Sequence, residues 1–251
     1  MLHGDGVEDE LWPAKYLKEP DLKARRDPTT GRTALVILNS PIPDYDYFYR
    51  LYNHASFCLC ADGGADRLYS LLTNHKSGLD EIAALKQALP DIIHGDLDSL
   101  SDGTRSVYES LAVEVSQDPD QYSTDFGKAM NKVIERLPGI ESMLVLGSIG
   151  GRVDQGVGLL GELYREQTVR HPGIRFWLFS EASSGLLQRN IGILPLYGPA
   201  VITTEGLEWD VQDWSTEMGG QMSTSNHIVA DEIGIFTDNE VLFTVERATG
   251  R

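Results

Sequence analysis

The sequence predicts an α/β fold, in which a parallel sheet covered by helices is followed by a small antiparallel β domain. Apolar strand-like runs alternate with helical patterns from residue 33 to residue 180, which is typical of a parallel sheet with helices on both faces. Acidic loops recur in this part after about 30 residues, the length of one strand–helix–strand unit. From about residue 186 the apolar runs are short and lie between turn residues, which favours antiparallel strands.

Turn and capping residues set the boundaries of the elements in the alternating part. Pro90 ends the helix that we expect over residues 79–89. Thr124 is a suitable N-cap for the helix expected over residues 125–137, whose apolar side chains recur at helical spacing. The expected strands cover residues 33–38, 57–61, 91–94, 113–116, 142–146 and 174–180, and the other expected helices cover residues 44–55, 64–73, 104–111 and 155–170.

The C-terminal part contains short runs with the composition of β-strands. Asp238 and Asn239 stand between the last two runs and predict a hairpin turn. The expected strands cover residues 192–196, 200–204, 207–211, 227–230, 233–237 and 241–245. We therefore expect three parts, which are a polar N-terminal arm over residues 1–31, an α/β domain over 32–185 and a β domain over 186–251.

The composition is that of a globular protein with a strong negative charge. Of the 251 residues, 41% are hydrophobic and 24% are charged, which are ordinary fractions. Lys and Arg together number 21 and Asp and Glu 38, which gives a net charge of −17. This charge argues against a nucleic-acid partner, because binding to the phosphate backbone needs a positive face. An anionic substrate would need magnesium or local arginines to offset the repulsion.

Neither a membrane span nor an export signal is expected. The sequence has no run of about 18 apolar residues, and the acidic segment at residues 1–10 lacks the apolar stretch of a secretory signal. Cys58 and Cys60 alternate along one expected strand, so we expect buried core thiols rather than a metal or redox pair. These features are typical of a protein of a reducing compartment, and we expect a cytoplasmic location.

Four acidic residues follow four of the apolar runs. Asp62, Asp96, Asp125 and Asp154 each stand in a loop after an expected strand. If the strands are parallel, these loops meet at the carboxyl ends of the strands, where open α/β sheets bind their ligands. Four acidic loops at one edge indicate a site for metal and phosphate.

Two of these loops carry further signals. Asp96 and Asp98 are two residues apart, so in an extended segment both carboxylates face one side, which suits magnesium. The alternative is a solvated turn, since Asp and Gly are common in turns. Gly63 and Gly64 follow Asp62 and would let backbone amides approach a phosphate and allow positive φ. The alternative there is a tight turn without a ligand.

The loop at residues 150–155, Gly-Gly-Arg-Val-Asp-Gln, also joins a strand to a helix. The guanidinium of Arg152 could bind phosphate oxygens. Asp154 could cap the helix or bond to a ligand, and Gln155 could do either. The sequence contains neither a P-loop nor a Gly-x-Gly-x-x-Gly after a strand, and His94 beside the acidic loop is expected to be structural.

Taken in order, these motifs resemble those of the thiamine pyrophosphokinase family. The resemblance covers residues 33–245 and lies in the segments CADGGADRLY (60–69), HGDLDSL (94–100), DPDQYSTDF (118–126), GSIGGRVDQ (147–155), GLEWDV (206–211) and MSTSN (222–226). It implies a Rossmann-like catalytic domain followed by a β-sandwich, assembled as a homodimer. It also implies transfer of the pyrophosphoryl group of ATP to the hydroxyl of thiamine, with release of AMP.

The resemblance further implies roles for single residues. Asp96, Asp98 and Asp125 would hold Mg²⁺ with Asp62 close by, and one of these acids would accept the thiamine hydroxyl proton. The implied catalytic residues are Asp62, Asp96, Asp98, Asp125, Arg152 and Asp154; the implied nucleotide-binding residues are Gly63, Gly64, Thr124 and Arg152; and the implied thiamine-binding residues are Gln121, Asp154, Gln155, Trp209, Ser225 and Asn226. Trp209 would stack on the thiamine of the partner subunit.

Some alternatives remain open at this stage. Trp209 could be ordinary β-sandwich core, and the segment at residues 223–226 could be a plain turn. Tyr122 stands where many family members have an acid, and the neighbouring Asp120 could substitute for that acid. Besides an active pyrophosphokinase, the residues therefore allow a non-catalytic binder of thiamine or nucleotide, favoured by Tyr122, and a magnesium-dependent nucleotide hydrolase.

Overall fold

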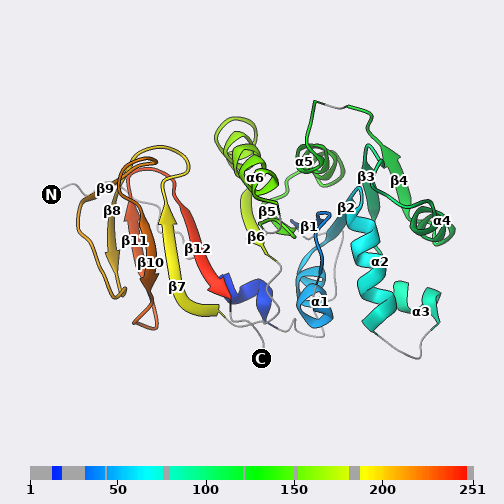
Figure 1. The fold of residues 1–251 in the computed structure, drawn as a ribbon, viewed down its shortest axis with the longest axis horizontal. Helices are drawn as coiled ribbons and strands as arrows, with labels where there is room; N and C mark the ends of the chain where they lie inside the picture. The colour runs from blue at the N-terminus through cyan, green and yellow to red at the C-terminus, as the bar shows by residue number, and fades with distance from the viewer. Residues whose placement is uncertain are drawn as a thin grey trace.

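The computed structural model describes residues 13–18, 32–42, 44–75, 80–120, 122–149, 152–180 and 187–247. Its N-terminal domain contains a sheet of six parallel strands in the order β4-β3-β2-β1-β5-β6, shown on the right in Figure 1. The strands are β1 (Thr33–Ile37), β2 (Phe57–Ala61), β3 (Ile92–Gly95), β4 (Glu114–Gln117), β5 (Ser142–Leu146) and β6 (Arg175–Phe179). This confirms the predicted parallel sheet.

Helices cover both faces of this sheet, as the alternation of elements predicts. They are α1 (Tyr45–His54), α2 (Gly64–His75), α3 (Glu81–Leu85), α4 (Asp102–Ser110), α5 (Asp125–Arg136) and α6 (Val153–Arg165), the last of which continues as a π-helical turn, η2 (Glu166–Arg170). Asp44 caps α1, and Thr124 caps α5, since its hydroxyl accepts a bond of 3.1 Å from the amide of Gly127.

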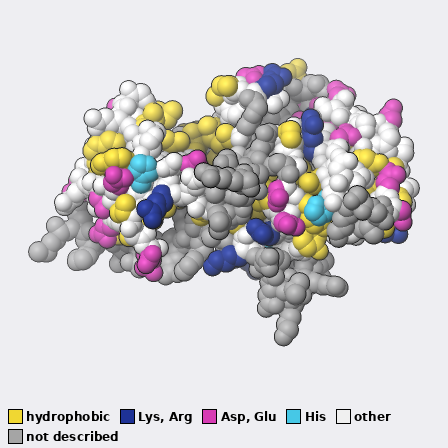
Figure 2. All heavy atoms as spheres, turned by 60° about the horizontal axis from the view of Figure 1, so that its bottom comes forward, with side chains coloured by type: hydrophobic (Ala, Val, Ile, Leu, Met, Phe, Trp, Pro, Cys, Tyr) yellow, Lys and Arg dark blue, Asp and Glu magenta, His cyan; other side chains and the backbone are white. Residues whose placement is uncertain are grey.

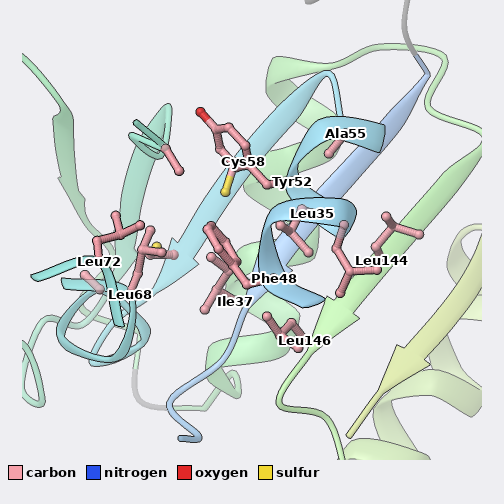
Figure 3. Packing of buried hydrophobic residues seen from close by; sticks show 14 of the residues in the cluster. Leu35, Ile37, Phe48, Tyr52, Ala55, Cys58, Leu68, Leu72, Leu144 and Leu146 are labelled. Atoms are coloured by element: carbon pink, nitrogen blue, oxygen red, sulfur yellow. The ribbon is translucent and has the colours of Figure 1, made fainter. Parts of the chain in front are cut away.

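Alternate residues of β1 pack into two separate apolar clusters, which shows that the strand is buried on both faces. Leu35 and Ile37 face the cluster that α1 and α2 cover (Figure 3). Ala34 and Val36 face the second cluster, which contains residues of α5 and α6. Strands that are buried on both sides read as continuous apolar runs, which is why the sequence marks them so clearly. The thiols of Cys58 and Cys60 are buried in the first cluster, as expected.

The C-terminal domain consists of two antiparallel sheets of three strands each. Their orders are β10-β7-β12 and β11-β8-β9, and the strands are β7 (Leu187–Leu194), β8 (Ala200–Glu205), β9 (Trp214–Thr216), β10 (Ser223–His227), β11 (Gly234–Thr237) and β12 (Leu242–Arg247). Ile191 and Ile193 of β7 and Ile202 of β8 belong to one buried cluster between the sheets, so the domain is a β-sandwich.

Two predictions for this domain are wrong. The hairpin expected at Asp238 and Asn239 is a connection between sheets, because β11 pairs with β8 whereas β12 pairs with β7. The strand expected over residues 207–211 is a tight turn. The carboxylate of Asp210 accepts bonds from the backbone amides at Gly206 and Leu207, which folds the segment back on itself. The strand β9 lies a few residues further on and was not expected.

The described part of the N-terminal arm packs on the α/β domain. A 3-10 helix, η1 (Pro13–Leu17), lies beside α1 (Figure 1), and the ring of Tyr16 packs edge-on against His54 and Trp177. The rest of the segment 1–31 lies outside the described residues.

Aromatic residues also join the two domains. Tyr197, between β7 and β8, stacks on Tyr164 of α6, and its hydroxyl donates a bond of 2.6 Å to Gln167. Burial, together with the charge of Glu240, raises the pKa of Tyr197 to about 12. The phenol therefore stays neutral at physiological pH and keeps its donor.

Two surface features relate to the expected partners. On the face in Figure 2, the Lys and Arg side chains of the described residues form separate groups among acidic ones rather than one continuous basic surface. Within the described ranges, the helices are too short or too polar to cross a bilayer.

Candidate active site

Three carboxylates meet at the carboxyl edge of the parallel sheet. Asp62 follows β2, Asp96 follows β3, and Asp125 is the first residue of α5, after β4. One carboxylate oxygen from each of them lies within 4.8 Å of the other two. The three strands are neighbours in the sheet, which explains why acids so distant in sequence converge. The sequence-based prediction that acidic loops meet at this edge is confirmed for these three residues.

Asp62 is held rigidly in this cluster. Its side chain is 2% exposed, and both of its carboxylate oxygens accept bonds from the amide of Ser99, at 3.1 and 3.3 Å. Asp62 itself has the positive φ of the turn, 45°, whereas the sequence analysis gave that role to the two glycines. Gly63 and Gly64 are needed for close packing instead, because a Cβ on Gly64 would lie 2.3 Å from the carbonyl oxygen of Ile37.

Asp96 forms a buried ion pair that the sequence analysis missed. The ammonium nitrogen of Lys128 lies 2.9 Å from Oδ2 of Asp96, and the side chain of Lys128 is 1% exposed. This contact holds the pKa of Asp96 below its usual range. Lys128 stands one helical turn after Asp125 on α5, so both side chains project from one face of the helix toward the cluster. The one-turn spacing of Asp125 and Lys128 on a helix is the sequence signal that could have predicted the ion pair.

The other two carboxylates behave in the opposite way. Burial raises the pKa of Asp62, and the charges of Asp125 and Asp96 add to the effect. Asp125 is more exposed, but loss of hydration around its carboxylate and the charge of Asp96 raise its pKa as well. Clustered carboxylates repel each other unless a cation neutralises them. Their number, closeness and oxygen ligands fit Mg²⁺, which binds a few carboxylates and fills its shell with water and phosphate oxygens.

The remaining predicted residues of the α/β domain lie outside this cluster. Asp98 is exposed, and its amide bonds to the carboxylate of Asp96. Arg152 and Asp154 form an exposed, bidentate ion pair with each other, with the Nε–Oδ1 bond at 3.1 Å. Their loop follows β5, and β1 lies between β5 and β2 in the sheet, which separates it from the strand that carries Asp62. Gln155 is exposed beside them.

The loop before α5 is ordered by its own side chains. The carboxylate of Asp120 accepts bonds from the amide of Tyr122 and the hydroxyl of Ser123, which lowers the pKa of Asp120. Asp120 therefore stabilises its own turn instead of joining the cluster, and the side chain of Tyr122 is fully exposed. Gln121 lies outside the described residues, as do Gly150 and Gly151.

In the β-sandwich, Trp209 is presented on the surface. It is 56% exposed, so it is not a core residue of the single chain. Asn226 is 5% exposed and holds the Trp209 backbone at both ends, accepting a bond of 3.2 Å from its amide and donating one of 2.9 Å to its carbonyl. Ser225 has a positive φ of 61°. His227 packs against the indole and bonds to Glu208 at 2.6 Å.

A parallel sheet with acids at its carboxyl edge, joined to a β-sandwich, places this chain among the α/β proteins that bind ligands at the ends of their strands. Two family models match it: "Thiamin pyrophosphokinase, catalytic domain" over residues 48–177 and "Thiamin pyrophosphokinase, vitamin B1 binding domain" over residues 181–242. The chain belongs to the thiamine pyrophosphokinase family, as its motifs predict.

Individual relatives agree with this placement over most of their length. Thiamine pyrophosphokinase 1 of Arabidopsis thaliana is 32% identical over 240 residues, covering 86% of this chain and 87% of that protein. Thiamine pyrophosphokinase of Saccharomyces cerevisiae is 31% identical and covers 85% of each. The solved structure of yeast thiamin pyrophosphokinase superimposes with a TM-score of 0.73 at 26% identity, covering 90% of both chains. That of the Candida albicans protein, at 24% identity and a TM-score of 0.72, has the same fold.

Proposed function

We propose that this chain is an ATP:thiamine diphosphotransferase, which makes thiamine diphosphate and AMP from thiamine and ATP. The observation that carries the proposal is the cluster of Asp62, Asp96 and Asp125 at the carboxyl edge of the sheet. Membership of the thiamine pyrophosphokinase family supports the same reaction. In this reaction the hydroxyl oxygen of thiamine bonds to the β-phosphorus of ATP, and the bond from that phosphorus to the oxygen of the α-phosphate breaks.

Asp62, Asp96 and Asp125 are the residues that would hold Mg²⁺, with Asp98 as a further acid beside Asp96. The ion would supply charge neutralisation at the phosphates and polarise the phosphorus that is attacked. The hydroxyl proton of thiamine passes to one of the carboxylates. Asp62, Asp96, Asp98 and Asp125 are the acids that stand close enough to the proposed phosphate site to take that role.

The surrounding loops would bind the nucleotide. Arg152 is exposed and has a single described partner, Asp154, so its guanidinium can turn to phosphate oxygens when ATP binds. Asp154 then becomes available for substrate. We assign Gly63, Gly64 and Thr124 to the nucleotide because they line the turns that carry Asp62 and Asp125.

The β-sandwich would supply the thiamine site. A cation over an indole face gains about 0.5–2 kcal/mol, and the exposed Trp209 offers such a face to the thiazolium ring. Asn226 fixes the turn that presents it, and Ser225, Gln155 and Gln121 complete the proposed contacts. We propose a homodimer in which Trp209 serves the site of the partner subunit. Its exposure in the single chain supports that arrangement.

The proposal also covers the domain boundaries of the chain and its location in the cell. We place the catalytic domain at residues 32–185 and the thiamine-binding domain at residues 186–251, preceded by an arm over residues 1–31. The buried thiols of Cys58 and Cys60 suit a reducing environment, and we propose the cytoplasm as the site of action.

The decisive experiment is incubation of the purified protein with ATP, Mg²⁺ and thiamine, with all products identified by mass spectrometry. AMP and thiamine diphosphate should form together, and only when thiamine and the metal are both present. The variant Asp125→Asn should make neither product. Asp102→Asn, which alters an exposed acid in the first turn of α4, is the matched control and should keep full activity.

Other outcomes would identify other functions. AMP formed without thiamine would indicate a nucleotide hydrolase. Thiamine binding without any product would indicate a non-catalytic binder, as the exposed Tyr122 would then suggest. ADP formed with thiamine monophosphate would contradict direct pyrophosphoryl transfer.

A further inference from the structure

Lys128 is a buried lysine at the edge of the acid cluster. Among the residues that the structure describes, it is the only Lys or Arg in the buried set. Burial of an ammonium group is costly unless carboxylates or hydrogen bonds compensate it. Lys128 has three donors, and in the described residues one of them bonds to Asp96, at 2.9 Å. The protein therefore maintains a desolvated cation, with donors to spare, at the edge of the acidic cluster.

The charge balance of the cluster indicates that Lys128 can also neutralise a bound anion. Asp62, Asp96 and Asp125 contribute three negative charges and Lys128 one positive charge, which leaves −3 + 1 = −2 when all are ionised. One divalent ion balances the charge of these four residues, and the exposed Asp98 beside Asp96 adds a further negative charge. A triphosphate that then binds brings further negative charge, and a lysine already inside the site meets part of it without recruitment of a mobile surface side chain.

The position of the ammonium nitrogen is suitable for phosphate. The nitrogen of Lys128 is 2.9 Å from Oδ2 of Asp96. The ammonium group therefore lies directly beside the acid cluster, where its remaining donors can bond to a phosphate oxygen that binds next to Asp96.

We propose that Lys128 is a phosphate-binding residue, which joins Asp96 to the pyrophosphoryl group during its transfer. This inference rests on the proposed function, because it takes the phosphates of ATP as the anion. The alternative is that Lys128 only balances the charge of Asp96 and holds the fold. The two roles differ in which ligand loses affinity when the charge is removed.

The test compares Lys128→Met with Lys132→Met. Lys132 lies one turn further along α5 and pairs with Glu135 at 2.9 Å, so it is a matched control. Binding of Mn²⁺ without nucleotide is measured by electron paramagnetic resonance, and binding of Mg-ATP by calorimetry. We expect Lys128→Met to weaken Mg-ATP binding at least tenfold, whereas Mn²⁺ binding stays the same or becomes tighter. Lys132→Met should leave both unchanged.

A second variant guards against misfolding. Lys128→Gln removes the charge but keeps a polar side chain with N–H donors, although a shorter one, and it should show the same selective loss of Mg-ATP affinity. Unchanged Mg-ATP affinity in a folded Met or Gln variant would overturn the proposal. Loss of Mn²⁺ binding with no further loss for Mg-ATP would also overturn it, in favour of the purely structural role. If the unmodified protein binds Mg-ATP but makes no thiamine diphosphate, the proposed function fails and these binding data still decide the role of Lys128.

Discussion

The acid cluster and the Trp209 turn are both candidate binding regions, but they are built in opposite ways. The cluster is assembled from three strand ends and is supported from inside by the buried Asp62 and Lys128. The Trp209 turn is held mainly through backbone groups, by the side chains of Asn226 and Asp210, and its indole is 56% exposed.

The two regions differ in whether the residues proposed to bind ligands also stabilise the fold. In the acid cluster, Asp96 pairs with the buried Lys128 and Asp62 is itself buried, so a substitution of either acid alters binding and folding together. In the Trp209 turn the two roles belong to different residues, because Asn226 holds the turn and Trp209 offers the surface. The predictions below test this separation.

The largest effect is expected from Asp96→Asn. It removes a proposed metal ligand and leaves the buried Lys128 without its charged partner. Turnover should fall about 100-fold or more, and the free energy of unfolding should fall by about 3 kcal/mol. Asp125→Asn should reduce turnover as strongly with little loss of stability. Activity assays and urea unfolding of both variants check this, and equal stability of the two would contradict the importance of the ion pair.

The second-largest effect is expected from Asn226→Ala. It removes three hydrogen bonds, to both ends of Trp209 and to the amide of His227, and leaves these partly buried backbone groups without that partner. We expect a loss of about 1–3 kcal/mol in unfolding free energy and weaker thiamine binding. Thr224→Ala, an exposed position on the same strand, serves as the control. A stable variant with normal thiamine affinity would show that the turn does not depend on Asn226.

Trp209→Ala should affect binding alone. The loss of a cation–π contact of about 0.5–2 kcal/mol corresponds to a fall in thiamine affinity of up to about 30-fold. Stability should change little, because the side chain is exposed, and Mg-ATP affinity should stay normal. Calorimetry with each ligand measures this. An equal loss for both ligands would instead indicate a folding role for Trp209.

The smallest effect concerns pH. Because the pKa of Asp62 is raised, its ionised form is disfavoured in the folded protein. The charged carboxylate therefore lowers the stability of the protein at pH values above this raised pKa. The loss is absent at pH values below the ordinary pKa of an aspartate. In the absence of metal, Asp62→Asn should therefore be more stable than the unmodified protein at pH 7, and the difference should shrink as the pH falls toward 4. Urea unfolding at several pH values tests the sign. Mg²⁺ should stabilise the unmodified protein more than the variant.

The sequence was most informative where strands are buried on both faces. β2 and β5 begin and end where their apolar runs do, because a central parallel strand contacts apolar groups on every side. It was least informative in the β-sandwich. The Asp238–Asn239 connection resembles a hairpin locally, and only the pairing of β11 with β8 and of β12 with β7 distinguishes it from one.

Within the site, the acids were easier to predict than their support. Each acid stands in a glycine- or serine-rich loop after a strand, a context that indicates a ligand site. Lys128 lies instead inside an amphipathic helix, between Phe126 and Met130. There a lysine reads as part of a solvated face, and only its position one turn after Asp125 places it in the core of the site. Similarly, the support that Asn226 gives to Trp209 joins a turn to strand β10, between residues 17 positions apart in the sequence.

The origin of the three carboxylates in β2, β3 and α5 has a consequence for the order of events during synthesis. A nascent chain that has not yet reached Asp125 holds only part of the cluster, however well β1 and β2 have paired. Tight capture of a divalent ion would thus begin only once a long stretch of the chain has left the ribosome and its parallel strands have closed. The luminescence of a lanthanide ion added during refolding could therefore report when this half of the sheet assembles.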